Sequence, residues 1–108
     1  MSQQGLGEFE EIVLLAVAIL GDDAYGVTIR EEITDRTGRK VSIGAMQSAL
    51  KRLETKGYLE SEMGEATPTR GGKRKRYFKV TQAGMSSLRA ARDVRNQMWD
   101  AIPNPALG

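Results

Sequence analysis

The residues of this chain best suited to chemistry are six basic side chains between positions 70 and 79, where no acidic residue occurs: Arg70, Lys73, Arg74, Lys75, Arg76 and Lys79. They surround Gly71-Gly72 and lead into the β-prone Tyr77-Phe78. The whole chain has 16 lysines and arginines against 14 aspartates and glutamates, so its positive charge is concentrated here. Concentrated positive charge attracts phosphate. The segment therefore predicts a basic hairpin that binds a polyanion; a solvated loop that aids solubility is the alternative.

The composition excludes the usual catalytic and metal sites. With no cysteine and no histidine, the chain cannot form Ser-His-Asp or Cys-His groups or the common zinc sites. Its carboxylates include adjacent pairs, which diverge on a helix and are read as solvated faces or helix caps. We therefore predict no enzyme activity, no metal and no cofactor. The pairs are Glu10-Glu11, Asp22-Asp23 and Glu31-Glu32.

Two helices are predicted before residue 40. In the first, apolar residues recur at spacings of three and four from Phe9 to Leu20 and cover more than one side of the helix. The apolar run is too short to span a bilayer, which favours a soluble, cytoplasmic protein. Asp23 is a candidate cap for the second helix, which begins near Tyr25 and stops at Gly38.

A third helix is predicted from Ser42, a candidate N-cap, to Gly57. Its apolar positions indicate the side that faces the core, and its other side is small, hydrogen-bonding and basic. The apolar positions are Ile43, Met46, Leu50 and Leu53.

A hairpin and a last helix complete the chain. Residues 58–63 alternate like a half-buried strand, residues 64–72 form a loop, and a return strand runs from Lys73 or Arg74 to Val80. Thr81 then caps a helix that stops at Pro103. One stripe of this helix is apolar and consists of Met85, Leu88, Ala91, Val94, Met98 and Ile102.

This order predicts a mainly α fold with a small β hairpin, namely a winged helix-turn-helix with three helices, a two-stranded wing and a C-terminal dimerisation helix. Residues 1–80 would form the DNA-binding domain, residues 81–102 the dimerisation helix of the same compact unit, and residues 103–108 a flexible tail. The third helix would enter the major groove of double-stranded DNA.

The predicted DNA contacts come from the third helix and the wing. Gln47 can pair with adenine, Lys51 can reach guanine or a phosphate, and Arg52 can contact a phosphate or pair internally with a carboxylate. The wing would follow the flanking backbone or the minor groove. The predicted contacts are Ser42, Ala45, Gln47, Ser48, Lys51 and Arg52 from the helix, and Arg70, Lys73, Arg74, Lys75 and Arg76 from the wing.

The chain also resembles the PadR-like winged-helix transcriptional regulators from Glu8 to about Arg92. The resemblance rests on the joint order of several short motifs. They are Glu8-Phe9-Glu10 followed by Ile12-Val13-Leu14-Leu15-Ala16, Tyr25-Gly26, Ser42-Ile43-Gly44-Ala45, residues 49–57 and residues 76–84. Gln47 departs from the family pattern, because many members have an aromatic residue there, and this leaves base specificity open.

The resemblance implies a homodimeric DNA-binding regulator, usually a repressor, whose last helix packs on the partner subunit with help from the first helix. The C-terminal stripe supports this, although it could instead fold back on its own core. Some members bind flat aromatic ligands at the dimer interface, and Trp99 could stack on such an effector or simply pack in the interface. The predicted interface consists of Phe9, Ile12, Met85, Leu88, Val94, Met98, Trp99 and Ile102.

The sequence thus predicts a dimeric, sequence-specific transcriptional regulator. The alternative is a winged-helix module that binds another protein without sequence-specific DNA binding.

Overall fold

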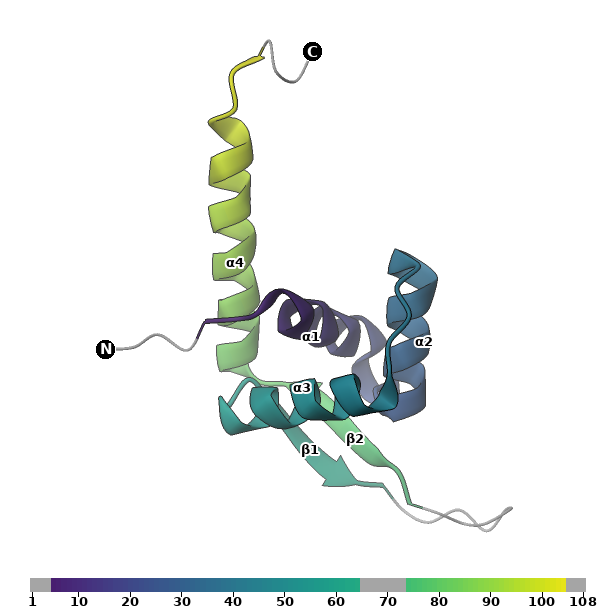
Figure 1. The fold of residues 1–108 in the computed structure, drawn as a ribbon. Coiled ribbons are helices and arrows are strands. Elements are labelled where there is room, and N and C mark those ends of the chain that lie inside the picture. Colours follow the sequence, from purple (N-terminus) through teal and green to yellow (C-terminus); the bar gives the residue numbers. More distant parts are fainter. Residues whose placement is uncertain (1–4, 65–73, 105–108) are drawn as a thin grey trace.

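The described part of the chain folds as four α-helices and a two-stranded antiparallel sheet (Figure 1). The structure, a computed structural model, describes residues 5–64 and 74–104. The predicted fold, mainly α with a small β hairpin, is confirmed. Its elements are α1 (Glu8–Leu20), the 3₁₀ turn η1 (Gly21–Asp23), α2 (Gly26–Thr37), α3 (Ile43–Thr55), β1 (Leu59–Met63), β2 (Arg76–Val80) and α4 (Gln82–Asp100).

The apolar core is centred on α1, which contacts α2, α3, β2 and α4. Because neighbours cover α1 on several sides, Val13, Leu14 and Val17 are almost completely buried. The prediction that α1 is covered on more than one side is confirmed by Leu14 and Val17, whereas Leu15 and Ile19 are 44% and 51% exposed. The other helices contribute Ile29, Ile33, Met46, Ala49, Leu50, Leu53 and Leu88 to the core.

The start of α2 differs from the prediction in its capping residue. The Thr28 hydroxyl accepts a hydrogen bond from the Tyr25 N–H at 3.0 Å and lies 2.5 Å from the Asp23 carbonyl oxygen, to which it donates. The predicted Asp23 side-chain cap is wrong, because η1 takes up Asp23 and the N-cap falls on Tyr25. The predicted stop at Gly38 is confirmed: Gly38 has a φ of 72°, and its N–H donates to the Thr34 carbonyl at 2.8 Å.

The start of α3 is capped as predicted, because the Ser42 hydroxyl accepts a hydrogen bond from the Ala45 N–H at 3.0 Å. Gly57 follows the helix with a φ of 81°, as expected for a helix stop. The core position predicted for Ile43 is wrong, since this side chain is 58% exposed. The inward face of α3 is filled by Met46, Ala49, Leu50 and Leu53 instead.

The hairpin is shorter than predicted at its second strand. Leu59 pairs with Val80 and Met63 pairs with Arg76, so β2 begins at Arg76 and not at residue 73 or 74. In β1 only Leu59 is buried, and the alternation expected for residues 58–63 is therefore weak. Residues 65–72 of the predicted loop lie outside the described residues.

A tight junction joins the end of α3 to the start of α4. The Thr81 hydroxyl donates to the Gly57 carbonyl at 2.6 Å, and the Thr81 N–H donates to the Tyr58 carbonyl at 3.0 Å. A Cβ atom on Gly84 would lie 2.4 Å from that same Tyr58 oxygen. Glycine is therefore required at position 84 for the close approach of the two backbones.

Gly84→Ala should lower the free energy of unfolding by about 2 kcal/mol, because the added methyl group would push α4 away from the backbone of Tyr58. Urea unfolding followed by circular dichroism measures this change. Gly44→Ala is the matched control: a Cβ atom at this other helical glycine meets nothing within 4 Å. The control should be neutral or slightly stabilising, and equal costs at the two sites would contradict the packing argument.

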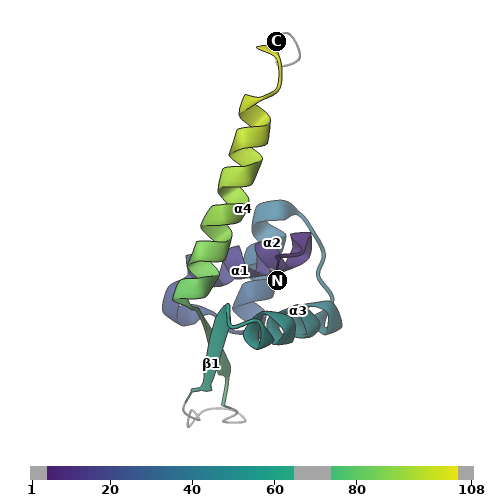
Figure 2. The ribbon, with the colours of Figure 1, turned by 90° about the vertical axis from the view of Figure 1, so that its left-hand side faces the viewer.

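The second half of α4 extends beyond the other elements in both views (Figures 1 and 2), although Arg95 in this half donates to the Glu11 carboxylate of α1 at 2.6 Å. As predicted, Thr81 caps the helix, accepting a hydrogen bond from the Gly84 N–H at 3.0 Å. All residues from Arg92 to Asp100 are exposed. Among the described helices, none is long and apolar enough to cross a membrane. Residues 105–108 of the predicted tail lie outside the described part of the chain.

Candidate nucleic-acid interface

The outward face of α3 has polar and basic side chains in reach of a ligand. Gln47, Ser48 and Lys51 are exposed and have no hydrogen-bond or ion-pair partner among the residues that the structure describes. Gly44 and Ala45 are also exposed, and because their side chains are minimal, the backbone of the first turn is accessible to a ligand. The structure therefore brings the predicted reading residues of α3 together on one accessible surface.

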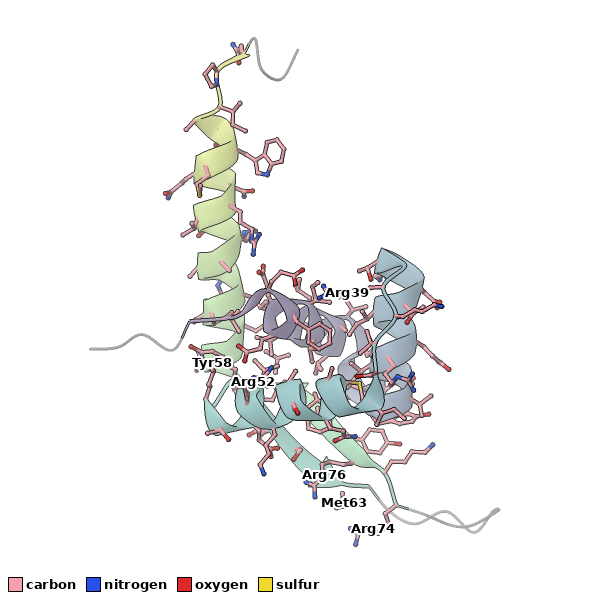
Figure 3. All side chains as sticks on the ribbon, viewed as in Figure 1. Arg39, Arg52, Tyr58, Met63, Arg74 and Arg76 are labelled. Carbon is pink, nitrogen blue, oxygen red and sulfur yellow. The ribbon has the colours of Figure 1, made fainter. Side chains whose placement is uncertain are left out.

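Arg52 lies at the edge of this surface nearest to α1 (Figure 3). Its Nε donates to Glu10 Oε2 at 2.7 Å, while Lys56 Nζ donates to Glu10 Oε1 at 2.7 Å. Of the two alternatives for Arg52, the structure shows the internal pair with a carboxylate. The Arg52 side chain remains 53% exposed. It borders a shallow groove lined by Ser48, Lys51, Arg52, Thr55 and Lys56.

Glu10 is a buried carboxylate that the sequence reasoning treated only as a solvated or capping residue. It does act as a cap, because Oε1 also accepts the Gly7 N–H at 3.0 Å. Burial alone would raise the pKa of Glu10, but the hydrogen bonds from Lys56, Gly7 and Arg52 outweigh it and lower the pKa from 4.5 to about 2. Glu10 is therefore ionised at neutral pH and fastens α3 to α1.

Two of the described basic residues of the wing are held by local contacts. Arg74 Nε donates to the Gly64 carbonyl at 2.7 Å, and Arg76 Nη1 donates to the Ser61 hydroxyl at 3.0 Å. Both arginines lie at the end of the hairpin away from α4 (Figure 3). Two predicted wing contacts lie outside the described residues; they are Arg70 and Lys73.

Lys75 connects the wing to the start of α2. Its Nζ lies 4.4 Å from the centroid of the Tyr25 ring, and that ring meets Tyr77 edge-on with centroids 5.5 Å apart. The Phe78 N–H also donates to the Ala24 carbonyl at 2.9 Å. These contacts fix the angle of the wing relative to the helices. Sequence reasoning missed them, because residues about 50 positions apart form them.

The predicted dimer residues of α4 are exposed, with one exception. Met98 and Trp99 are 68% and 61% exposed, and Met85 and Val94 are also exposed. The interface position predicted for Leu88 is wrong. This side chain is 6% exposed and belongs to the protomer's own core, because it lies in the half of α4 that packs on α1 and the sheet. Most of the exposed apolar surface of α4 therefore lies beyond Leu88, at Val94, Met98 and Trp99, while Met85 is exposed before it.

The predicted dimer residues of α1 and the C-terminal end are half-buried. Phe9 and Ile12 pack against the core, and Ile102 is partly covered. The Arg39 guanidinium lies 5.0 Å from the centroid of the Phe9 ring and donates to the Glu8 carboxylate. Phe9 therefore has an intramolecular cover in addition to any role between subunits.

Residues 14–90 match the Transcriptional regulator PadR-like family. This span includes the second half of α1, all of α2, α3 and the hairpin, and the first half of α4. One curated relative, uncharacterized protein X of Lysinibacillus sphaericus, is 34% identical over 84 residues, which make up 76% of this chain and 72% of the relative.

Solved structures of transcriptional regulators share the fold. A PadR family transcription regulator of hypervirulent Clostridium difficile matches with a TM-score of 0.69 at 28% identity, over 90% of this chain and 98% of the other. A transcriptional regulator from Clostridium thermocellum matches with a TM-score of 0.69 at 26% identity, over 85% and 84%. The predicted winged-helix class is thereby confirmed. The chain belongs to the PadR-like family of transcriptional regulators.

Proposed function

We propose that this protein is a cytoplasmic, homodimeric repressor that binds double-stranded DNA with sequence specificity. Residues 1–80 form the DNA-binding domain, and residues 81–102 form the dimerisation helix. The single observation that supports the DNA role best is the outward face of α3, where Gln47, Ser48 and Lys51 are exposed and have no partner among the described residues. Unpartnered donors and acceptors on one helix face are suited to base edges in the major groove.

The contacts divide into those that select the sequence and those that strengthen binding. Gln47 reads adenine through its amide, and Lys51 reaches guanine or a phosphate. Arg74 and Arg76, together with Arg70 and Lys73, follow the flanking phosphates and set the salt dependence of binding. Lys75 is exposed and also follows the flanking phosphates, from a position over the Tyr25 ring. Arg52 stays paired with Glu10 and contributes positive potential beside the groove.

The dimer is proposed from the exposed part of α4. Val94, Met98 and Trp99 are exposed apolar residues in the half of α4 that extends beyond the rest of the protomer, where Arg95 pairs with Glu11 of α1. A second copy of α4 would bury them and place two copies of α3 about 34–36 Å apart, one helical turn of DNA. A flat aromatic effector that stacks on Trp99 at this interface would couple ligand binding to the spacing of the two helices.

The direct test is fluorescence anisotropy of the full chain with duplex DNA from upstream of its own gene and with a scrambled duplex, across a salt series. We expect preferential binding at physiological salt, with two chains per site. Equal, weak binding to both duplexes that disappears as salt rises would instead support a module that binds another protein.

Gln47→Ala should weaken binding to the preferred duplex by about 1–3 kcal/mol and leave binding to the scrambled duplex unchanged, because it removes a base contact and no charge. Gln97→Ala is the matched control, since Gln97 is an exposed glutamine on α4. The same anisotropy titration measures both variants. An equal loss on both duplexes would mean that Gln47 does not read a base.

A further inference from the structure

One side chain on the reading helix is explained neither by the core nor by the polar contacts proposed above. Ile43 is the first residue of α3, and at 58% exposure it is the most exposed branched aliphatic side chain among the described residues. The core is complete without it, because Met46, Ala49, Leu50 and Leu53 fill the inward face. The Ile43 side chain is therefore free to contact an apolar group of a partner.

The position of Ile43 restricts what that partner can be. Ile43 precedes Gln47 by four residues, and side chains four apart on a helix lie on the same face. It directly follows the Ser42 N-cap and so lies in the first turn of α3. In helix-turn-helix proteins, the first residues of the recognition helix contact base edges. Gly44 and Ala45 beside it have too little side chain to hold this turn away from DNA.

DNA offers one apolar group in the major groove, the 5-methyl group of thymine. We propose that Ile43 contacts a thymine methyl group in each half-site and selects thymine at that position. This inference rests on the proposed DNA-binding function. Four residues of helix rise about 6 Å, and neighbouring base pairs are about 3.4 Å apart. The thymine therefore lies one or two base pairs from the adenine that Gln47 contacts.

The test uses uracil, which lacks only the methyl group of thymine. Selection from a random duplex pool with the full chain gives a bound sequence, and each thymine in one half-site is then replaced by uracil in turn. One replacement should weaken binding by the wild type about fourfold, the effect of burying one methyl-sized group. Ile43→Ala should bind the unmodified duplex more weakly and should be insensitive to that same replacement.

Ile19→Ala is the matched control, because Ile19 is 51% exposed on α1 and lies outside the proposed DNA surface. It should retain wild-type affinity and uracil sensitivity. Selection that enriches no sequence would overturn the proposed function and the thymine contact together. An enriched sequence with no sensitive thymine, or with a sensitivity that survives in Ile43→Ala, would overturn the thymine contact alone. An Ile43→Ala chain that sediments as a monomer would also overturn it and would assign Ile43 to a protein interface.

Discussion

Glu10→Ala should lower the free energy of unfolding by about 3 kcal/mol at pH 7, measured by urea unfolding. The Glu10 side chain is 7% exposed and accepts hydrogen bonds from Arg52 and Lys56. Removing it leaves Lys56, whose side chain is only 18% exposed, without its carboxylate partner. Removing one partner of a buried ion pair is costly, because the remaining charge stays desolvated.

The control for this prediction is two residues away. Glu8 pairs with Arg39, but its side chain is 63% exposed, so solvent screens the pair. Glu8→Ala should therefore cost less than about 1 kcal/mol. If both alanine variants lost the same stability, the burial of Glu10 would not matter.

The contribution of Glu10 should also depend on pH in a defined direction. Its pKa is lowered on folding from 4.5 to about 2, so the folded state favours the ionised form. The stabilisation is fully present above about pH 4.5 and is lost as the pH falls toward 2. The difference in stability between the wild type and Glu10→Ala should shrink over this range. A difference that stays constant down to pH 2 would contradict the ionised state of Glu10.

Local features of the fold could be predicted from the sequence because neighbouring residues determine them. Ser42 and Thr81 cap their helices as expected, and Gly38 ends α2 through its left-handed backbone. A hydroxyl or a glycine acts on groups within a few residues, so its effect can be recognised in the sequence. The order of helices and strands follows from the same local signals.

Contacts between distant residues could not be predicted in this way. Glu10 and Arg52 are 42 positions apart, and nothing in the sequence identifies Glu10 among the chain's carboxylates as Arg52's partner. Periodicity placed Ile43 and Leu88 on apolar stripes but could not tell which part of a stripe a neighbour covers. Ile43 is exposed and Leu88 is buried, the reverse of what was predicted for each. Burial is decided by where a helix meets its neighbours.

Met98→Glu should raise the dissociation constant of the proposed dimer at least about a hundredfold, because a symmetric interface would bury the unpaired charge twice. Met98 is 68% exposed in the protomer, so the fold itself should be unaffected. Analytical ultracentrifugation measures the dimer, and circular dichroism checks the fold. Gln97→Glu is the matched control, since it adds the same charge one residue away, off the apolar stripe. It should remain dimeric.

Loss of the dimer should reduce DNA affinity far more than loss of any single base contact does. When two copies of α3 are joined, binding of the second half-site is intramolecular, with an effective concentration in the millimolar range for short connections. A monomeric Met98→Glu chain loses this advantage although its α3 and wing are intact. Anisotropy with a full site and with a half-site separates the two effects, because half-site affinity should equal that of the wild type. A dimeric Met98→Glu chain with full affinity would mean that the exposed stripe of α4 has another partner.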